Sequence, residues 1–318
     1  MKTMKSKFYS LALAAGMLTL TACSDDNTND SNNDKGNGIE NGSTLKGTIT
    51  EDVTLKAGNT YKLSGEYIVE AGATLNIEEG VKIISIYDNI VDYILVKQGA
   101  KINAVGTPDK PIVMTSEKEE PGAWGGIHIC GKAHTNAEGG KGSSEIGGAV
   151  YGGNDDADNS GTLQYIRLEY TGFAFDEEHE ANGISFYGVG NGTIVDHCEA
   201  YKGSDDGFEF FGGSVNVSNM VVVSCSDDSF DWTEGWNGKG TDLVAYQEAK
   251  ATLGYDCDCL IEADNNENDN AATPVSHPVL KNLILAGNGE SKQGIRLRRG
   301  TQADIDKAKV CGKGQPLV

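Results

Sequence analysis

Proline and basic side chains are the scarce components of this chain. Only 6 of the 318 residues are Pro, which excludes a proline-rich linker protein. Glycine is abundant at 42 residues, about 13% against an ordinary share of about 7%, which argues against a helical bundle and favours short strands joined by tight turns. Acidic residues outnumber basic ones, 47 to 26, and the formal net charge is −21. This charge excludes nucleic acid as a favoured partner, because binding to phosphates needs a cationic face.

Motifs for metal, nucleotide and nucleophilic chemistry are also missing. The five histidines form no His-x-x-x-His pair and none accompanies a nucleophile, and there is neither a phosphate loop nor a dinucleotide fingerprint. Cys257-Asp258-Cys259 lacks the second cysteine pair that a zinc site needs. Cys198 and Cys225 fit two roles, small core residues or a disulfide, and their spacing does not decide between them.

The first 42 residues predict where the protein goes. Three lysines precede the apolar run Phe8–Leu20, which is too short to span a bilayer as a mature helix. Leu20-Thr21-Ala22-Cys23 resembles a lipobox, so we expect residues 1–22 to be a lipoprotein signal peptide and Cys23 to be lipidated, with palmitate. The alternative is an ordinary signal peptide with a chance cysteine. Residues 23–42 are mostly Asn, Asp, Ser, Gly and Thr, a composition typical of a flexible linker.

The residues after the expected lipidation site indicate a location. Cys23-Ser24-Asp25-Asp26 resembles the acidic signal by which some Gram-negative bacteria export lipoproteins to the cell surface. We therefore expect an outer-membrane protein, lipid-anchored and facing the cell surface. No later segment is apolar over 18 residues, so membrane contact is expected only through the anchor.

Internal repeats organise residues 43–318. Similar segments recur at spacings of 22 to 27 residues, and looser copies occur elsewhere: Ile68–Leu75 with Leu95–Ile102, Asn182–Gly188 with Ser204–Phe210 and Ser226–Trp232, and Gly126–Gly131 with Gly294–Gly300. Each copy alternates apolar and polar residues, the pattern of a half-buried strand, and is bounded by Gly or Asp. A β-sandwich also alternates but has no reason to repeat at this length. The repeats predict an all-β fold, a single right-handed parallel β-helix over residues 43–318.

The alternation assigns side chains to the inside and the outside of the coils. The apolar positions should stack inward: Ile127 and Ile129, Ile184 and Phe186, Phe208 and Phe210, Phe230 and Trp232, Ile295 and Leu297. Two outward columns then result, one of His128, Ser185, Glu209, Asp231 and Arg296, the other of Cys130, Tyr187, Phe211, Thr233 and Arg298. Tyr187 and Phe211 would lie side by side on the surface, where aromatic rings can bind the faces of sugars. The alternative is that a loop covers Phe211.

The same columns crowd carboxylates along one edge. Glu209 and Asp231, one coil apart, would lie about 5 Å from each other, near the separation in a retaining glycosidase. Asp205 belongs to the same group, and the candidates for acid catalysis are Asp206, Glu209, Asp227, Asp228 and Asp231. Like charges this close raise a pKa or require a bound cation. Alternatively, the turn aspartates only bind turn amides.

Calcium is the one cofactor that the sequence suggests. Asp156, Asp158 and Ser160 place oxygens at alternate positions, as the first half of a calcium-binding loop does. The twelfth position is Arg167 instead of Glu, which argues against an EF-hand and leaves a simpler loop site. Residues 262–270 form a second acidic, Asn-rich segment with the same two interpretations.

Several motifs together resemble known families. Ala71–Gly80, Pro111–Ser116 and Trp124–Ile127 resemble bacterial surface β-helix proteins, and Tyr151–Asn154, Asp158–Leu163, Asp205–Gly213 and Asp227–Trp232 resemble a family of secreted bacterial β-helix lipoproteins. This resemblance covers about residues 45 to 318 and implies a pectin-lyase-like solenoid, with no settled activity. Family members usually continue beyond the Gly294–Gly300 coil, so the β-helix domain is expected to be truncated at its C-terminus.

The paired Asp-Asp turns also resemble polygalacturonase-type hydrolases. Those enzymes add a Gly-His-Gly turn, which is absent here, and this absence argues against catalysis. The sequence therefore favours a cell-surface lipoprotein that binds an extended ligand such as a polysaccharide. One alternative is a polysaccharide lyase or glycoside hydrolase, and another is a structural or adhesive surface protein.

Overall fold

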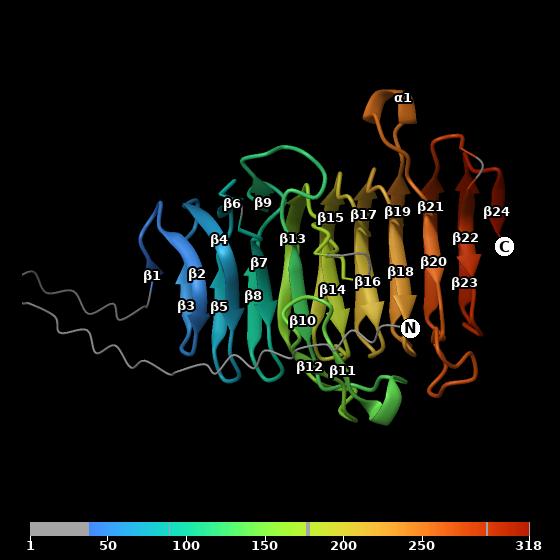
Figure 1. Ribbon diagram of the computed structural model, residues 1–318, viewed down its shortest axis with the longest axis horizontal. Coiled ribbons are helices and arrows are strands. Elements are labelled where there is room, and N and C mark those ends of the chain that lie inside the picture. Colours follow the sequence, from blue (N-terminus) through green and yellow to red (C-terminus); the bar gives the residue numbers. More distant parts are fainter. Residues whose placement is uncertain (1–37, 89, 176–178, 291, 318) are drawn as a thin grey trace, which may run out of the picture. The chain divides into compact units, whose positions relative to one another are not determined.

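The computed structural model describes residues 38–317 except for residues 89, 176–178 and 291. These residues form a right-handed parallel β-helix, as the repeats predict, and each coil passes through three faces in the same order (Figure 1). The predicted signal peptide 1–22 and Cys23 lie outside the described residues. Strand pairing rules out the β-sandwich, because successive coils pair in parallel.

The front face holds one short strand from each coil. Its members are the second halves of β2 (Thr44–Ile49) and β4 (Thr60–Val69), then β7 (Tyr93–Val96), β10 (Ile127–Cys130), β14 (Ile184–Tyr187), β16 (Phe208–Phe211), β18 (Phe230–Thr233), β20 (Ile261–Ala263), β22 (Gln293–Leu297) and β24 (Gln315–Leu317). This face carries the site described below.

The other two faces are joined within single long strands over most of the length. The second face holds β1 (Gly38–Ile39), β3 (Val53–Leu55), β5 (Thr74–Ile77), β8 (Lys101–Val105) and the first halves of β13 (Gly161–Glu169), β15 (Ile194–Tyr201), β17 (Asn216–Val223), β19 (Lys239–Tyr246), β21 (Val279–Ala286) and β23 (Asp304–Cys311). The third face holds the first halves of β2 and β4, then β6 (Lys82–Ser85), β9 (Ile112–Ser116) and the second halves of β13 to β23.

A single left-handed residue bends each long strand from the second face to the third. These corner residues have φ between 51° and 60°: Tyr165, His197, Asn219, Asp242, Asn282 and Lys307. Such a φ reverses the local direction of the backbone without ending the strand pairing on either side. A glycine is needed at another close approach. A Cβ on Gly207 would meet the Ser229 backbone oxygen and the Val222 side chain at 2.6 Å, which explains the glycine directly before β16.

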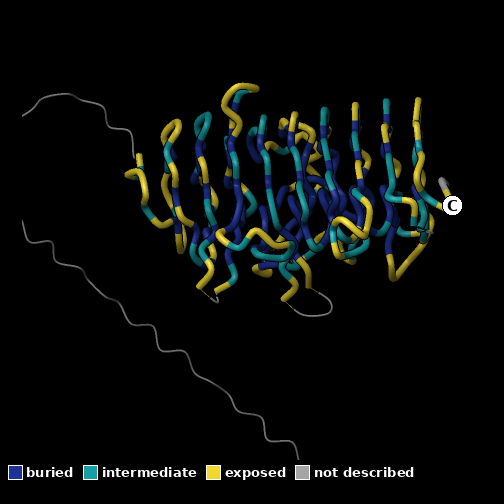
Figure 2. Tube along the Cα trace, turned by 90° about the horizontal axis from the view of Figure 1, so that it is seen from above, coloured by how far each residue is buried: buried dark blue, intermediate teal, exposed yellow. Residues whose placement is uncertain are grey.

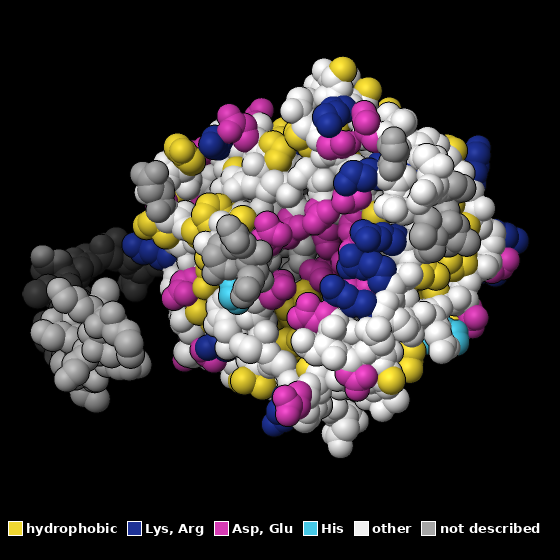
Figure 3. Space-filling view, turned by 45° about the vertical axis from the view of Figure 1, so that its right-hand side comes forward, with side chains coloured by type: hydrophobic (Ala, Val, Ile, Leu, Met, Phe, Trp, Pro, Cys, Tyr) yellow, Lys and Arg dark blue, Asp and Glu magenta, His cyan; other side chains and the backbone are white. Residues whose placement is uncertain are grey.

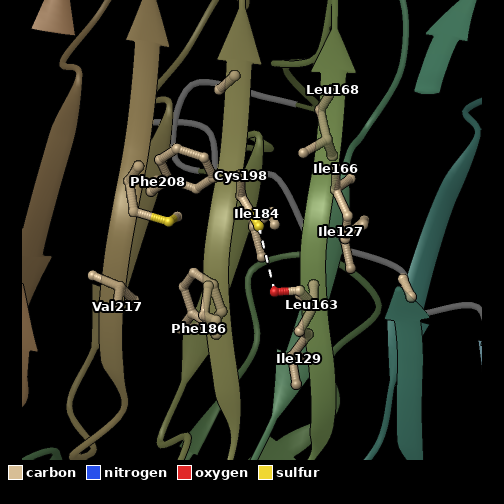
Figure 4. Packing of buried hydrophobic residues seen from close by; sticks show 14 of the residues in the cluster. Ile127, Ile129, Leu163, Ile166, Leu168, Ile184, Phe186, Cys198, Phe208 and Val217 are labelled. Atoms are coloured by element: carbon tan, nitrogen blue, oxygen red, sulfur yellow. Dashed lines mark hydrogen bonds between the residues drawn. The ribbon is translucent and has the colours of Figure 1, made fainter. Parts of the chain in front are cut away.

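The inward side chains form one continuous core, part of which Figure 4 shows, and Figure 2 shows buried residues in successive coils. The predicted inward pairs are buried, and aromatic rings stack from coil to coil: Phe186 lies 5.1 Å from Phe210, whose ring lies 4.1 Å from that of Trp236. Only Leu297, near the end of the described chain, is partly exposed. Burial of these side chains is what stabilises the coils, because a single coil cannot bury its apolar face alone.

The coils begin before the predicted boundary at residue 43. β1 pairs Gly38 with Thr54, and Ile39 packs against the core while its carbonyl accepts a hydrogen bond of 3.1 Å from the Tyr61 hydroxyl. The predicted linker is therefore too long at its C-terminal end. Ile39 is the large apolar residue of that segment, and its burial explains the difference.

An insertion between β10 and β13 covers part of the front face. This front insertion (residues 131–160) contains a 3-10 turn, Glu138–Gly140, and an antiparallel hairpin of β11 (Gly142–Ser143) and β12 (Val150–Tyr151). Its apolar side chains form a second buried cluster with outward side chains of β7, β10, β14 and β16. A short helix, α1 (Lys250–Leu253), interrupts the connection from β19 to β20.

The cysteines of the described chain are free thiols. Cys198 and Cys225 are core residues, so the disulfide alternative is wrong for this pair, and Cys311 alone among the six described cysteines is exposed. Among the residues with described structure, no helix is both long and apolar enough to cross a membrane.

Candidate functional site

A cleft of about 710 Å³ lies on the front face, over the strands from β14 to β22. Outward side chains of β14, β16 and β18 form its floor. One wall is the β11–β12 hairpin, and the opposite wall is the turn after β20 together with the residues after β22. Figure 3 shows the hollow, with acidic side chains gathered at its centre and basic side chains along one side. The cleft therefore has a strongly polar lining with both signs of charge.

The register of the strands places the floor residues as the alternation predicts. Ser185 pairs with Glu209, and Glu209 pairs with Asp231 on the next coil. The structure adds a coil that the repeats did not reveal, because β20 lies between β18 and β22 and places Glu262 between Asp231 and Arg296. The outward column of charged residues is thus continuous across these coils.

The beginning of this column is covered. His128 and Ser185 are completely buried: the His128 ring lies beside those of Tyr93 and Tyr187, and Ser185 accepts a hydrogen bond from the Asn182 amide. A His128 ring nitrogen, Nε2, lies 2.7 Å from the Gly125 carbonyl oxygen, and burial lowers the pKa of this histidine to about 4. The outward side chains become accessible only from β16 onward, where the front insertion ends and the cleft opens.

Tyr187 and Phe211, predicted to bind a ligand, do lie side by side, with ring centroids 4.4 Å apart. The prediction that they are on the surface is wrong, because Tyr187 is 0% exposed and Phe211 is 7% exposed. Tyr151 of the front insertion packs on Tyr187 at 5.1 Å, so the alternative of a covering loop is correct. Both rings still form part of the cleft lining at its covered end, and a role in binding stays a prediction.

Two of the five predicted acidic candidates line the cleft, Glu209 and Asp231. An oxygen of each lies within 4.8 Å of the other and of an Asp206 oxygen. The Asn182 amide donates to Glu209 at 2.6 Å, whereas Asp231 Oδ1 is buried and has no hydrogen-bond partner. Burial, followed by the charges of neighbouring carboxylates, holds the pKa of both groups well above their usual range.

The turn aspartates have a different role. The Asp228 amide donates to Asp206 Oδ1 at 2.9 Å, and the Cys259 amide donates in the same way to Asp228 Oδ1. These bonds join each turn to the next coil. The interpretation that the turn aspartates accept hydrogen bonds from turn amides therefore holds for Asp206 and Asp228, although each amide belongs to the following coil. Asp227 is exposed, and an oxygen of it lies within 4.8 Å of oxygens of Asp205 and Asp206. None of these turn residues lines the cleft as the structure describes it.

The wall after β20 and β22 is an ion-pair network. Arg298 donates to both oxygens of Asp264, at 2.9 and 3.0 Å, and also contacts Glu262. Arg299 donates to Asp264 at 2.8 Å, and Arg296 to Glu262 at 2.9 Å. Sequence reasoning placed both acidic members, Glu262 and Asp264, in an acidic loop segment and did not predict that they pair with these arginines. The signal that could have revealed this coil is Cys257-Asp258-Cys259. These residues precede β20 at the same distance at which Ser226–Asp228 precede β18, one coil earlier.

Two more carboxylates that the sequence did not indicate line the cleft, Glu145 between β11 and β12 and Glu234 directly after β18. Glu145 accepts a hydrogen bond of 3.3 Å from the Tyr187 hydroxyl, and burial raises the pKa of Glu145 to about 7. Glu234 Oε2 accepts from the hydroxyls of Tyr151 at 2.7 Å and Thr135 at 2.8 Å, and burial raises its pKa as well. The front insertion has no period, so no sequence pattern placed Glu145 here.

The predicted calcium loop is occupied by internal hydrogen bonds. Asp156 Oδ1 lies 2.6 Å from His134 Nδ1, while Ser160 donates to Asp158 at 3.3 Å. The structure thus brings Asp158 and Ser160 together and turns Asp156 toward His134; calcium binding here stays a prediction.

In the second acidic segment, residues 262–263 belong to β20, and Asn265 Oδ1 accepts from the Ser276 amide at 2.8 Å.

The fold and the cleft define a class of protein, a parallel β-helix with a polar cleft across several coils of one face. The family model for the pectate-lyase-like β-helix domain matches residues 47–318, and the chain belongs to this family. This match confirms the resemblance to pectin-lyase-type solenoids. No curated protein and no solved structure matches the chain.

Proposed function

We propose that the protein binds a carbohydrate chain in the front-face cleft. The observation that carries this proposal is the polar lining of the cleft, drawn from successive coils between β14 and β22. At an interstrand spacing of about 4.8 Å, these coils extend over about 19 Å. A repeating ligand along the helix axis would then meet side chains at a regular spacing, and membership of the pectate-lyase-like domain family supports a carbohydrate as that ligand.

A substitution that fills the cleft tests this function. Thr233 lines the cleft on β18, and Thr241 occupies a similar, partly exposed position on β19 of the second face. We expect Thr233→Trp to abolish binding of whichever polysaccharide the full chain selects from a panel of neutral, acidic and amino-sugar polymers. Thr241→Trp, the matched control, should bind normally in the same calorimetric titration. Equal binding by the two variants would place any glycan site elsewhere, and no binding by the native chain would favour a structural or adhesive role.

Cleavage of the glycan is a second candidate function. The proximity of Glu209 and Asp231 in an open cleft favours it, because two carboxyl groups about 5 Å apart are the arrangement of retaining glycosidases. Raised pKa values would keep one group protonated as the general acid. We expect shortening of the bound polysaccharide to be lost in Glu209→Gln and Asp231→Asn and retained in Glu51→Gln, at an exposed position on another coil. Binding without shortening would exclude this second function.

We also propose that Cys23 anchors the protein to the outer membrane and that the β-helix faces the outside of the cell. The lipobox-like and acidic residues around Cys23 support this location. Metabolic labelling with palmitate should mark the native chain and not Cys23→Ser. Protease added to intact cells should remove the β-helix; its protection in intact cells would contradict the outward orientation.

A further inference from the structure

We infer that the carbohydrate bound by this cleft carries cationic amino sugars, and that polyuronates such as pectate are excluded. This inference rests on the proposed function, which it makes more specific. It depends on how the charges of the cleft are paired: its two arginines are already bonded to an acidic side chain, whereas several of its acids have only neutral hydrogen-bond donors as partners.

The count of charges around the cleft is unequal. Two guanidinium groups, those of Arg298 and Arg299, and His179 stand among the lining residues of the described chain, against six carboxylates: Glu145, Glu209, Asp231, Glu234, Asp264 and Glu267. A polyuronate carries one negative charge per sugar, which would raise the pKa values of these acids further and find no cationic partner among them, so the set disfavours a polyuronate.

The two arginines cannot compensate for this excess toward a uronate. Arg298 is bonded to both oxygens of Asp264, and Arg299 is bonded to the same carboxylate. The Asp264 side chain is only 7% exposed. A uronate that took either arginine would leave a buried carboxylate with fewer partners, and an uncompensated buried charge is strongly unfavourable.

The acids on the floor of the cleft and beside the hairpin are in the opposite situation. Glu209 accepts from the Asn182 amide, and Glu145 accepts from the Tyr187 hydroxyl. The hydrogen bonds to Glu234 come from two further hydroxyl groups. These donors are neutral, so the negative charges that appear on ionisation are not balanced by a bonded cation.

An ammonium group is the complementary ligand chemistry for such a set of acids. A sugar amine supplies a positive charge and three N–H donors, and its hydrogen bonds to carboxylates are charge-assisted. Asp231 Oδ1 adds a buried acceptor without a partner at this place. Each acid that is protonated in the empty cleft would lose its proton as the ammonium binds, because the nearby positive charge lowers its pKa. Binding should therefore release protons.

A pair of oligomers that differ only in the substituent on nitrogen, a charged ammonium group in one and a neutral acetamide in the other, tests the inference. The full chain is titrated calorimetrically with a β-1,4-linked glucosamine hexamer and with the fully N-acetylated hexamer, at mildly acidic pH where the free amine is protonated. We expect the glucosamine hexamer to bind at least roughly tenfold more tightly, as expected for a charge-assisted hydrogen bond. Titrations in buffers of different ionisation enthalpy should show proton release with the glucosamine hexamer only.

Isosteric variants connect the preference to the cleft. Glu209→Gln and Asp231→Asn should each lower the affinity for the glucosamine hexamer and leave that for the N-acetylated hexamer unchanged, whereas Glu51→Gln should alter neither. Their urea transitions verify that the variants are folded.

Other outcomes would overturn the inference in distinct ways. Equal affinities for the two hexamers would refute the amino-sugar specificity and leave carbohydrate binding in place. Tighter binding of a polygalacturonate oligomer would refute it as well. If chelator abolished binding and calcium restored it, an inorganic cation would be the partner of the acids instead of the sugar amine. Failure to bind any of the three oligomers or any polymer of the wider panel would instead contradict the proposed function itself.

Discussion

Glu145 offers a direct test of the charge argument, because its substitution should stabilise the protein in a pH-dependent way. The carboxyl group is largely buried between the hairpin and Tyr187, and burial is the main reason that its pKa rises from 4.5 to about 7. The nearby charges of Glu234 and Glu180 raise the pKa further, while the Tyr187 hydrogen bond and His179 lower it. Glu145→Gln keeps the shape of the side chain and an oxygen that can accept from Tyr187.

The magnitude follows from the two pKa values. Below pH 4.5 the carboxyl group is protonated in both the folded and the unfolded chain, so it contributes no pH dependence. Between pH 4.5 and about 7 only the folded chain holds the proton, and stability falls as the pH rises. Each unit of pKa difference corresponds to about 1.4 kcal/mol, so native Glu145 should cost about 3 kcal/mol once the pH is above 7. The Gln variant lacks this cost.

Urea unfolding at a series of pH values measures this difference. The free energy of unfolding of Glu145→Gln minus that of the native chain should increase by about 3 kcal/mol between pH 4 and pH 8. Glu51→Gln, at an exposed position, should show no comparable increase. A Glu145 difference that is constant with pH, or that shrinks as the pH rises, would refute the claim that burial keeps this acid protonated in the fold.

Three further outcomes are expected. NMR titration should find His128 neutral down to about pH 4, so its contribution to stability is retained above pH 6.5 and lost as the pH falls toward 4; a midpoint near 6.5 would contradict its burial. Arg298→Met should lower the free energy of unfolding by about 3 kcal/mol because it leaves a buried carboxylate short of partners, whereas the more exposed Arg299→Met should cost less than about 1 kcal/mol; equal effects would show that the network is not buried. In a Cys23→Ser background, a thiol reagent should label Cys311 fast and the remaining thiols only on unfolding, which mass spectrometry of the labelled peptides can verify.

The repeats were sufficient to predict the coils because the inside of a β-helix imposes the same requirement on every turn. Phe186, Phe210 and Trp232 stand at equivalent positions, and each must fill the core above its neighbour. The coil of β20 escaped prediction because Ile261-Glu262-Ala263 lacks the aromatic residues of the copies in β14, β16 and β18 and has no glycine directly before it, unlike the copies in β10, β14 and β16. Small side chains satisfy the core at this coil, so the pattern weakens while the structure continues.

The site was predictable only in part, for a different physical reason. Strand register follows from the repeat, and with it the adjacency of Glu209 and Asp231. What covers an outward column depends on loops, which have no period, so the front insertion could bury Tyr187 and Phe211 without any signal in the repeat.

The front insertion also decides where a ligand could bind along the outward column. At one end the column is buried, at Leu95 and at His128, which is neutral, and at the other end Arg296 is paired with Glu262. Between these ends lie Glu209 and Asp231, which are open to the cleft and lack a bonded cation. A ladder of identical strands would distribute ligand contacts evenly over the face. Here the covering insertion and the terminal arginines confine uncompensated negative charge to the middle coils, and a cationic group on a sugar chain would therefore fix the register of that chain along the helix axis.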